Sequence, residues 1–446
     1  MLSRRKRKKR KYLLRRYKHL IRIQRRRKKR RSTNGVRSYK DVFYSNRVYD
    51  FLSNHKFGRI RKSFISQIKR TVQIEIPPLF SISENPNETI EIIKQLFYYG
   101  TQRNITEIVI DHSQCINLEI AASTIMDVVV KAIRQWRFKN RIEINMSGMI
   151  PDIKRVKVVF IASGLAAHME VEFLSNVFAD MNKIRRFKLM SGLQNSSNAD
   201  EVATRLVEYI RQCLETQGFT LTKSGISSLG MIFGEVLDNS RIHGGKDTIW
   251  YALGHYQIYD DSNGFGEAQL VIFNFGNTIY EQISNPAVSG KEVIQKLNYL
   301  DEKHKHNYSR KWDKEMLATL LSLQEGISRL RDKNSIGNTR RGTGTVRLIE
   351  NFSLIGNTSG KESPLMTITS GTAQIRFDGK YALQPYTFDD DVFGHKSRKV
   401  IAFNQSNSLF QCPDPNNVIK LEQYFPGTII SLKFFFDKKY LERFVD

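Results

Sequence analysis

The chain of 446 residues is poor in cysteine, and its three cysteines lie far apart, at Cys115, Cys213 and Cys412. No two of them have CxxC spacing, so a disulfide framework and a structural zinc cluster are both poorly supported. No apolar run approaches the roughly 20 residues that a membrane-spanning helix needs. The first residues also lack the apolar core of a signal peptide. These absences predict a cytoplasmic protein without a membrane span.

Acidic residues are absent from the start of the chain, where Asp41 is the first. Residues 1–31 hold 19 lysines and arginines, and without them the net charge of +27 falls to +8. Like charges at this density disfavour compaction, which predicts a disordered basic arm over residues 1–31. The arm would bind nucleic acid or another polyanion through counterion release. Anionic lipid, or no specific role, is the alternative.

Residues 32–66 read as a polar, basic connector, after which strand and helix spacings alternate. Strands are predicted over 72–76, 105–111 and 141–145, and helices over 88–99, 118–136 and 153–163. This alternation predicts a small layered α/β domain over residues 67–182. Its order of elements resembles the STAS-like domains typified by anti-sigma-factor antagonists, and an unrelated α/β regulatory module is the alternative.

A second α/β domain is predicted over residues 185–446. Its helices are expected over 200–215, 224–243, 278–284, 291–300, 314–330 and 345–352. Its strands are expected over 248–259, 268–275, 365–370, 373–377, 399–403 and 428–435. Four short segments of this domain carry the chemistry.

The first segment places Glu235, Asn239 and His243 four residues apart on the predicted helix 224–243, near one face. A carboxylate and an amide on an otherwise apolar helix are costly to bury, and a cation with a phosphate would supply partners. The ExxxN pattern resembles the N-box of the GHKL, or Bergerat-fold, ATPases. The resemblance implies that Asn239 binds Mg²⁺ and that Glu235 is the catalytic base. For His243, packing at the helix end is preferred over a phosphate contact.

The second segment is a hydrophobic strand that runs into a turn from Asn274 to Thr278, where the family has its DxGxG box. The resemblance implies that Asn274 and Gly276 bind the nucleotide. Asn274 replaces the Asp that normally accepts the adenine amino hydrogen, and Thr278 replaces the second Gly. An amide oxygen still accepts a hydrogen bond but lacks the charge-assisted component. Adenine selectivity is therefore in doubt.

The third segment is rich in glycine and precedes the predicted helix 345–352. Gly342 and Gly344 let backbone N–H groups approach phosphate oxygens, and the helix adds its positive N-terminal end. It resembles the family's phosphate-binding lid, the G2 box. The resemblance implies phosphate contacts from Arg341, Gly342, Thr343, Gly344 and Thr345. Arg341 either clamps the phosphates or faces solvent.

The fourth segment, Pro426-Gly427-Thr428, resembles the Gly-Thr that lies behind the adenine in this family. An insertion of about fifty residues separates it from the strand 365–370. Thr372, in Ser370-Gly371-Thr372, competes for the same role. The four segments together resemble a Bergerat-fold α/β sandwich.

This resemblance implies an ATP- and Mg²⁺-binding regulatory protein whose lid closes on the nucleotide and switches interdomain or partner contacts, with slow hydrolysis. One alternative is an anti-sigma-factor-like Ser/Thr kinase that acts on a separate partner. Another is a nucleotide-binding interaction module without turnover. An unknown protein partner is expected, and a homodimer is possible.

Overall fold

The computed structural model describes residues 70–164, 187–193, 199–215, 218–243, 248–257, 266–327, 344–355, 364–435 and 441–443, with Val48, Leu52, 65–66 and 170–171. The chain divides into two units, residues 1–45 and residues 46–446, of which the second is compact. The basic arm and most of the connector lie outside the described residues. Every feature below belongs to the second unit, and the domain boundary near residue 183 stays a prediction.

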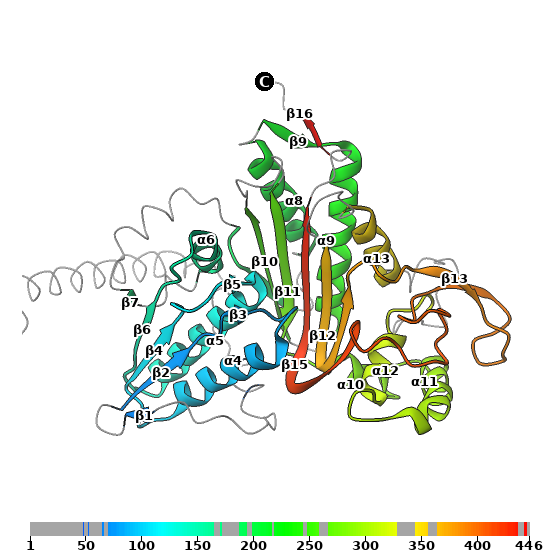
Figure 1. Ribbon diagram of the computed structural model, residues 1–446, viewed down its shortest axis with the longest axis horizontal. Coiled ribbons are helices and arrows are strands. Elements are labelled where there is room, and N and C mark those ends of the chain that lie inside the picture. Colours follow the sequence, from blue (N-terminus) through cyan, green and yellow to red (C-terminus); the bar gives the residue numbers. More distant parts are fainter. Residues whose placement is uncertain are drawn as a thin grey trace, which may run out of the picture. The chain divides into compact units, whose positions relative to one another are not determined.

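The fold is mixed α/β, as predicted, and contains two five-stranded sheets (Figure 1). The first sheet has the order β1 (Ile65–Ser66), β2 (Thr71–Glu75), β4 (Glu107–Asp111), β6 (Asn145–Met149) and β7 (Glu170–Val171). Strands β2, β4, β6 and β7 run parallel, and β1 is antiparallel to β2. In β2 and β4 alternate residues are buried, which matches the period of a strand.

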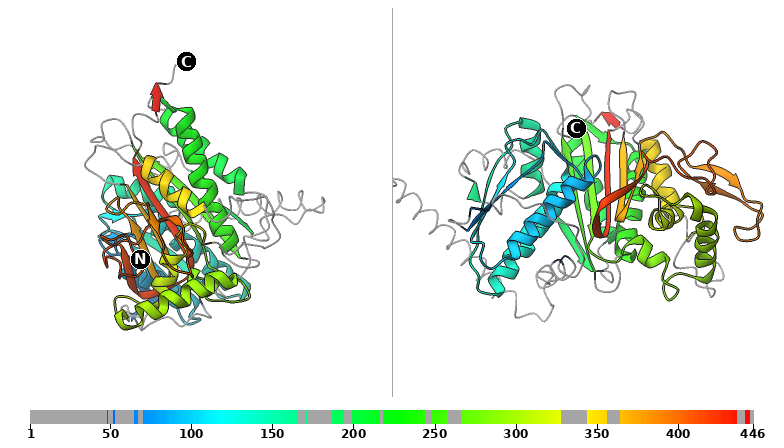
Figure 2. Two further views of the ribbon diagram at one scale, coloured as in Figure 1. Left: turned by 90° about the vertical axis from the view of Figure 1, so that its right-hand side faces the viewer. Right: turned by 60° about the horizontal axis from the view of Figure 1, so that its bottom comes forward.

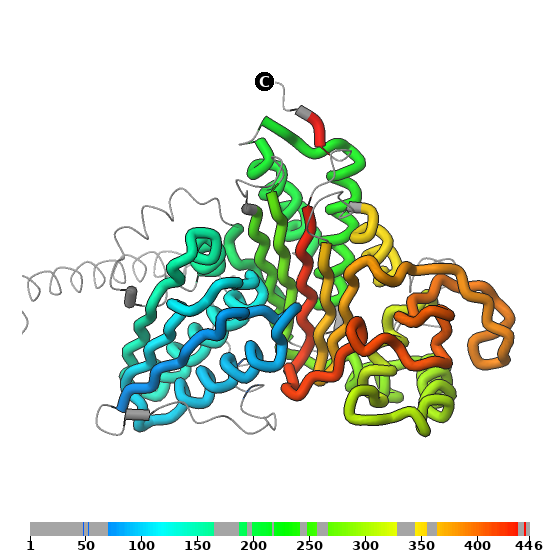
Figure 3. The backbone as a smooth tube through the Cα atoms, viewed as in Figure 1, coloured from blue at the N-terminus to red at the C-terminus, as the bar shows by residue number. Residues whose placement is uncertain are grey.

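The second sheet is antiparallel throughout and carries the predicted nucleotide-site strands. Its order is β12 (Leu365–Phe377), β15 (Val418–Phe435), β11 (Glu267–Asn274), β10 (Ile249–Gln257) and β8 (Met190–Leu193). In Figure 3 the red tube of β15 runs between the orange β12 and the green β11. β15 therefore pairs with β12 over residues 418–433 and with β11 over residues 428–435, so that its C-terminal part has a strand on each side.

Two groups of helices cover the two faces of the second sheet. On one face, α8 (Ala199–Glu215) contacts β10, α9 (Lys223–His243) contacts β10 and β11, and α13 (Gly344–Ile355) packs on α9. On the other face, α4 (Pro86–Thr101) contacts β15, and α5 (Ile120–Lys139) contacts β10 and β11. Figure 2 shows α4, in blue, running beside this sheet. Because α4 also contacts β2, it joins the two sheets.

The remaining elements surround these layers. They are α6 (Lys154–Ser163), α10 (Ile279–Ile283), α11 (Lys291–His304), the 3-10 helix η2 (Lys305–Asn307), α12 (Lys314–Leu321), the pairs β3 (Leu79–Phe80) with β5 (Asn117–Leu118) and β9 (Phe219–Leu221) with β16 (Leu441–Arg443), and the hairpin of β13 (Gln384–Thr387) and β14 (Ser397–Val400). No helix in the described ranges has the length and apolar character needed to cross a bilayer.

Side chains along β15 alternate between the two helical layers. Phe434 lines an apolar pocket together with Phe233 of α9, whereas the Ser431 hydroxyl donates to Glu119, just before α5. Since successive side chains of a strand point to opposite faces, Thr428 shares the α9 face with Phe434. One strand thus serves the predicted site on one face and the N-terminal layer on the other.

Glu119 is the centre of a polar network on the α5 face of the second sheet. Its carboxylate accepts hydrogen bonds from the Ser81 hydroxyl at 2.7 Å, from the Ser83 amide at 2.9 Å and from the Ser83 hydroxyl at 2.7 Å, besides that of Ser431. The Ser83 hydroxyl also lies 2.9 Å from that of Thr367 on β12. Hydrogen bonds to a charged acceptor are stronger than neutral ones, so this network fixes the N-terminal layer to β12 and β15.

Several predicted bounds need correction. The strands predicted over 365–370 and 373–377 are one strand, β12, with a register shift around Gly371, which has a φ of 62°. The helix predicted over 314–330 ends at Leu321. The strand predicted over 141–145 lies at Asn145–Met149, because Arg141 adopts a left-handed φ of 58° that no regular strand contains.

Replacing Glu119 tests how strongly the two layers depend on this network. Glu119→Ala removes the acceptor of four hydrogen bonds, so we expect the free energy of unfolding to fall by about 3 kcal/mol. Urea denaturation measures this change. Glu422→Ala, at an exposed position of the same β15, is the matched control and should cost less than about 0.5 kcal/mol. Equal losses in the two variants would contradict a structural role for the Glu119 network.

Candidate functional site

The predicted catalytic carboxylate and metal ligand both lie on α9, four residues apart. Glu235 and Asn239 are half-buried, whereas Val236 and Leu237 between them are fully buried against the sheet layer. The helix therefore holds both polar side chains at the border between its packed and its open side, as their spacing predicts. The side chain of His243 lies outside the described part of α9.

The first turn of α13 packs directly on Glu235. A Cβ atom at Gly344 would lie only 2.3 Å from Glu235 Oε2, so any larger residue here would require the Glu235 carboxylate to move. Arg347 Nη1 lies 4.0 Å from Glu235 Oε1. Burial raises the pKa of Glu235 above its ordinary value, the Arg347 guanidinium opposes this rise, and Asp238 adds to it. The end of the predicted lid and the predicted base thus meet in space.

The turn after β11 is held by Asn274, which is completely buried. Its Oδ1 accepts a hydrogen bond from the Gly276 amide at 3.0 Å. Its Nδ2 donates to the carbonyl and to the hydroxyl of Ser240, at 3.1 and 3.2 Å. Because Ser240 follows Asn239 on α9, this amide ties the turn to the helix that carries the predicted metal ligand.

The strand that bears Thr428 packs against the same turn. Thr428 is the cross-strand partner of Asn274, and Gly427 has a φ of 100°. A Cβ atom at Gly427 would lie 2.2 Å from the Asn274 carbonyl oxygen and 2.7 Å from the Gly276 nitrogen. Glycine is therefore required here both for its φ and for the close backbone approach.

Ser370 of β12 joins Gly427 and Thr428 to the start of α10. Its hydroxyl donates to the Gly427 carbonyl at 2.8 Å, lies 3.1 Å from the Thr428 hydroxyl and accepts from the Ile279 amide at 2.9 Å. No pattern in the sequence indicates this role, because Ser370 and Thr428 are paired only through the register of β12 and β15.

Thr278, which departs from the family's glycine, begins a helix. Its hydroxyl accepts from the Glu281 amide at 3.1 Å, and the Glu281 carboxylate accepts from the Thr278 amide at 2.8 Å, which is a capping box. Such a cap satisfies two backbone donors at the start of α10. The capping box thus explains why a threonine rather than a glycine stands at position 278.

Thr372, the competitor of Thr428, lies in a different environment. Its amide and hydroxyl donate to Glu315 of α12 at 3.0 and 2.5 Å, and Lys420 donates to its hydroxyl at 2.7 Å. Of the two threonines, it is therefore Thr428 that lies beside Asn274.

Part of the predicted phosphate lid lies outside the described residues, namely Arg341, Gly342 and Thr343. Gly344 and Thr345 open α13 and are half-buried. The structure therefore brings together Glu235, Gly344 and Arg347 at one place, and Asn274, Gly276 and Thr428 at another, with Ser240 and Asn239 of α9 between them. Ser240, Arg347 and Ser370 were not predicted as site residues.

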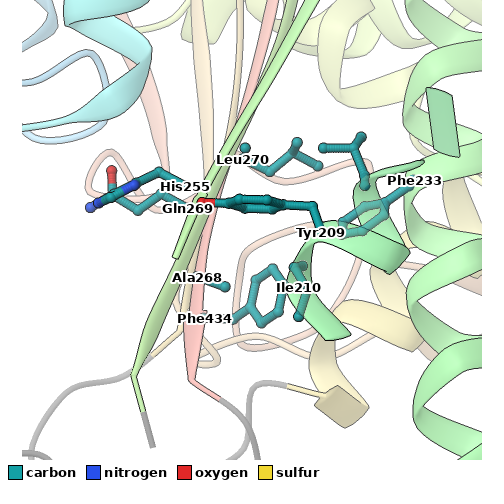
Figure 4. Close-up of a pocket in the computed structure, with 10 residues that line it drawn as sticks. Tyr209, Ile210, Phe233, His255, Ala268, Gln269, Leu270 and Phe434 are labelled. Carbon is teal, nitrogen blue, oxygen red and sulfur yellow. The ribbon is translucent and has the colours of Figure 1, made fainter. Parts of the chain in front are cut away.

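An apolar pocket lies elsewhere on the α9 face of the sheet (Figure 4). The ring of Tyr209 extends from α8 to the sheet, where its hydroxyl accepts from the Tyr256 amide at 3.1 Å. The lining residues are Leu206, Tyr209, Ile210, Phe233, Gly254, His255, Ala268, Gln269, Leu270 and Phe434. None of the predicted site residues is among them, so this pocket is a feature of the core.

A metal at the predicted site would need ligands from outside the protein. No three His, Cys, Asp or Glu side chains in the described ranges are grouped so as to hold an ion. Mg²⁺ commonly takes only one or two protein oxygens and completes its shell with water and substrate phosphates. The half-buried Asn239 amide, about one helical turn after Glu235 on α9, fits this mode of binding.

Comparison of the chain with protein-family models, curated proteins and solved structures gave no match.

Gly427→Ala tests the close packing around the Asn274 turn. The methyl group would meet the backbone of Asn274 and Gly276, which has little freedom to move. Gly379→Ala is the matched control, because Gly379 also has a positive φ, of 85°, but nothing lies within 4 Å of its Cβ position. We expect Gly379→Ala to lower the free energy of unfolding by about 1 kcal/mol through backbone strain alone.

Gly427→Ala should cost at least about 2 kcal/mol more than this control, because overpacking adds to strain. Urea denaturation of both variants measures the difference. Equal losses would mean that the strand and the turn separate without penalty, contrary to the packing described above.

Proposed function

We propose that the α9 face of the second sheet is a Bergerat-type site that binds ATP with Mg²⁺. The observation that carries this proposal is the contact of Glu235 with the first turn of α13, together with the pairing of Asn274 and Thr428. The four segments are spread over about 190 residues of sequence, and their described residues contact one another in two groups, Glu235 with Gly344 and Asn274 with Thr428, which supports the proposal.

Each residue has a role that follows from its chemistry. Asn239 supplies an amide oxygen for Mg²⁺, and Glu235 accepts a proton from the attacking water. The backbone amides that lead into α13 bind phosphate oxygens, helped by the positive end of this helix. Thr428 and Asn274 lie behind the adenine base of the nucleotide. Mg²⁺ supplies charge neutralisation for the phosphates when it is bound.

Burial and Asp238 both raise the pKa of Glu235, and a raised pKa makes a carboxylate a stronger base towards water. Arg347 counteracts this effect and favours the carboxylate. The balance of these groups supports a role for Glu235 in slow hydrolysis, with α13 as the element that moves.

We further propose that nucleotide binding is transmitted through α13 and β15. The Lys399 ammonium of β14 forms an ion pair with Glu350 of α13, so a shift of this helix would reach the inserted hairpin. On the opposite face, β15 contacts Glu119 through Ser431. These contacts provide two routes by which lid closure would change surfaces available to a protein partner.

The hydrogen bonds that Asn274 already makes within the protein favour a second candidate, an interaction module with weak nucleotide binding. Its Nδ2 donates to Ser240, and its Oδ1 accepts from Gly276, which leaves one lone pair on Oδ1 for a base. Recognition of adenine would then be weaker than with a carboxylate.

Phosphotransfer within the chain gains no support from the serines of the N-terminal layer. Ser81 and Ser83 bind Glu119 on the α5 face of the sheet, whereas Glu235 lies on α9 across the sheet. A kinase activity would therefore require a separate substrate protein.

ATP binding and turnover by two α9 variants test the main proposal. Glu235→Ala should bind Mg-ATP but lose hydrolysis by at least about 100-fold, since a positioned base contributes this much. Asn239→Ala should lose the Mg²⁺-dependent part of ATP binding. Isothermal titration calorimetry with and without Mg²⁺, and phosphate release, measure these effects. If the wild-type protein binds no ATP, the proposed function fails and the interaction module is favoured.

Asn274→Asp tests whether residue 274 recognises the adenine base. A carboxylate would accept the adenine amino hydrogen with charge assistance, so ATP affinity should rise by up to about tenfold while GTP affinity does not. The variant loses the hydrogen bond to the Ser240 carbonyl and should be less stable by about 1 kcal/mol. Equal changes for ATP and GTP would contradict the placement of the base beside residue 274.

A further inference from the structure

Within the described part of the chain, Arg347 brings a cation to the proposed catalytic carboxylate, yet neither the family resemblance nor its spacing singled it out. It lies in the first turn of α13, and its Nη1 atom is 4.0 Å from Glu235 Oε1. The side chains of Glu235 and Arg347 are 26% and 42% exposed. Both are therefore accessible to a ligand while they face each other across the α9–α13 contact.

Glu235 occupies a confined position at this contact. Its Oε2 atom would be 2.3 Å and its Cδ atom 3.2 Å from a Cβ at Gly344, so the carboxylate lies against the bare Cα of the glycine. An anionic phosphate group placed at the start of α13 would overlap this volume or face the carboxylate charge at close range. The two anions cannot share the position.

The ionised carboxylate is held only weakly. Burial opposes its charge more than Arg347 supports it, and Asp238 adds repulsion from the same helix. A phosphate group carries more charge than a carboxylate and offers more acceptor oxygens to an arginine. The phosphate is therefore the stronger of the two possible partners of Arg347.

We propose that Arg347 is a positioning residue that exchanges Glu235 for a nucleotide phosphate. In one position, Glu235 packs on Gly344 and faces Arg347. In the other, a phosphate takes Arg347 and the start of α13, and Glu235 is released towards Asn239 and the metal-bound substrate. This inference rests on the proposed function for the identity of the anion.

The exchange links phosphate binding to the position of α13. Glu350, one turn after Arg347, forms the ion pair with Lys399 of the inserted hairpin. A triphosphate that replaces Glu235 would therefore release the Glu235 carboxylate and change the position of α13. A ligand without the terminal phosphate would leave the Glu235 contact with Gly344 in place.

Inorganic tripolyphosphate is the probe that isolates this exchange from base recognition. Glu235→Gln removes the competing charge and should bind tripolyphosphate at least tenfold more tightly than the wild type. Asp238→Asn is the matched control, because it removes the same charge three residues away on α9 without touching Gly344. It should change the affinity less than threefold. Isothermal titration calorimetry on the full chain measures both.

Arg347 variants and hydrogen exchange supply independent readouts. Arg347→Gln should bind tripolyphosphate at least tenfold more weakly than the wild type, and Arg347→Lys should recover most of the loss. Without any ligand, Glu235→Gln should increase hydrogen exchange at amides 344–348 several-fold, whereas Asp238→Asn should not. A purely structural role for Arg347 would leave tripolyphosphate affinity unchanged.

The outcomes separate this inference from the proposed function. Equal gains in Glu235→Gln and Asp238→Asn overturn the exchange, since a general charge effect would explain them, and so does failure of every variant to bind tripolyphosphate. If ATP binds the wild type and Glu235→Gln gains nothing, the ATP site stands and the exchange fails. If tripolyphosphate follows the expected order but ATP binds no more tightly, the exchange stands and the purine site fails.

Discussion

The two-faced packing of β15 is the constraint on which the rest of the molecule depends. This strand is paired on both sides, so it cannot rotate or slip without breaking two ladders. Its register fixes Thr428 beside Asn274 on the α9 face and Ser431 beside Glu119 on the α5 face. A change at Gly427, in the interior of β15 and next to Thr428, therefore affects both helical layers.

The polar contacts on the two sides of this strand differ in how firmly they hold their carboxylates. On the α5 face, Glu119 accepts four hydrogen bonds, which suits a permanent attachment. On the α9 face, Glu235 faces Arg347 at 4.0 Å and is opposed by its own burial. A site that must move draws on the weakly held contacts of a fold. The contrast therefore assigns a structural role to the α5 face, and under the proposed function it leaves the α9 face to the switch.

The sequence predicted the strands and helices well where apolar periodicity is strong, as in α9 and β11, and less well where backbone conformation decides. The strand predicted over 428–435 begins ten residues earlier, at Val418 of β15. Two strands were predicted where the structure has the single strand β12, because a glycine such as Gly371 is typical of a turn. The strand continues through Gly371 with a shift in its register against β15. At the candidate site, Glu235, Asn239 and Asn274 were found through motif spacing. Arg347 and Ser370 were missed because their partners come from distant segments, which only the tertiary register brings together.

The departures from the family pattern have local physical explanations, and these explanations bear on function. Thr278 caps α10, and Asn274 bridges the Gly276 amide and the Ser240 carbonyl, which an ionised aspartate cannot do, because it has no donor for the carbonyl. Hydrogen bonds within the protein thus stabilise the turn, and they leave only one lone pair on Asn274 Oδ1 to bind a nucleobase. If a nucleotide binds, phosphate contacts near α13 must supply more of the affinity than base contacts do. A site of this kind would respond to the number of phosphates more than to the identity of the base, which suits a regulatory switch better than a rapid enzyme.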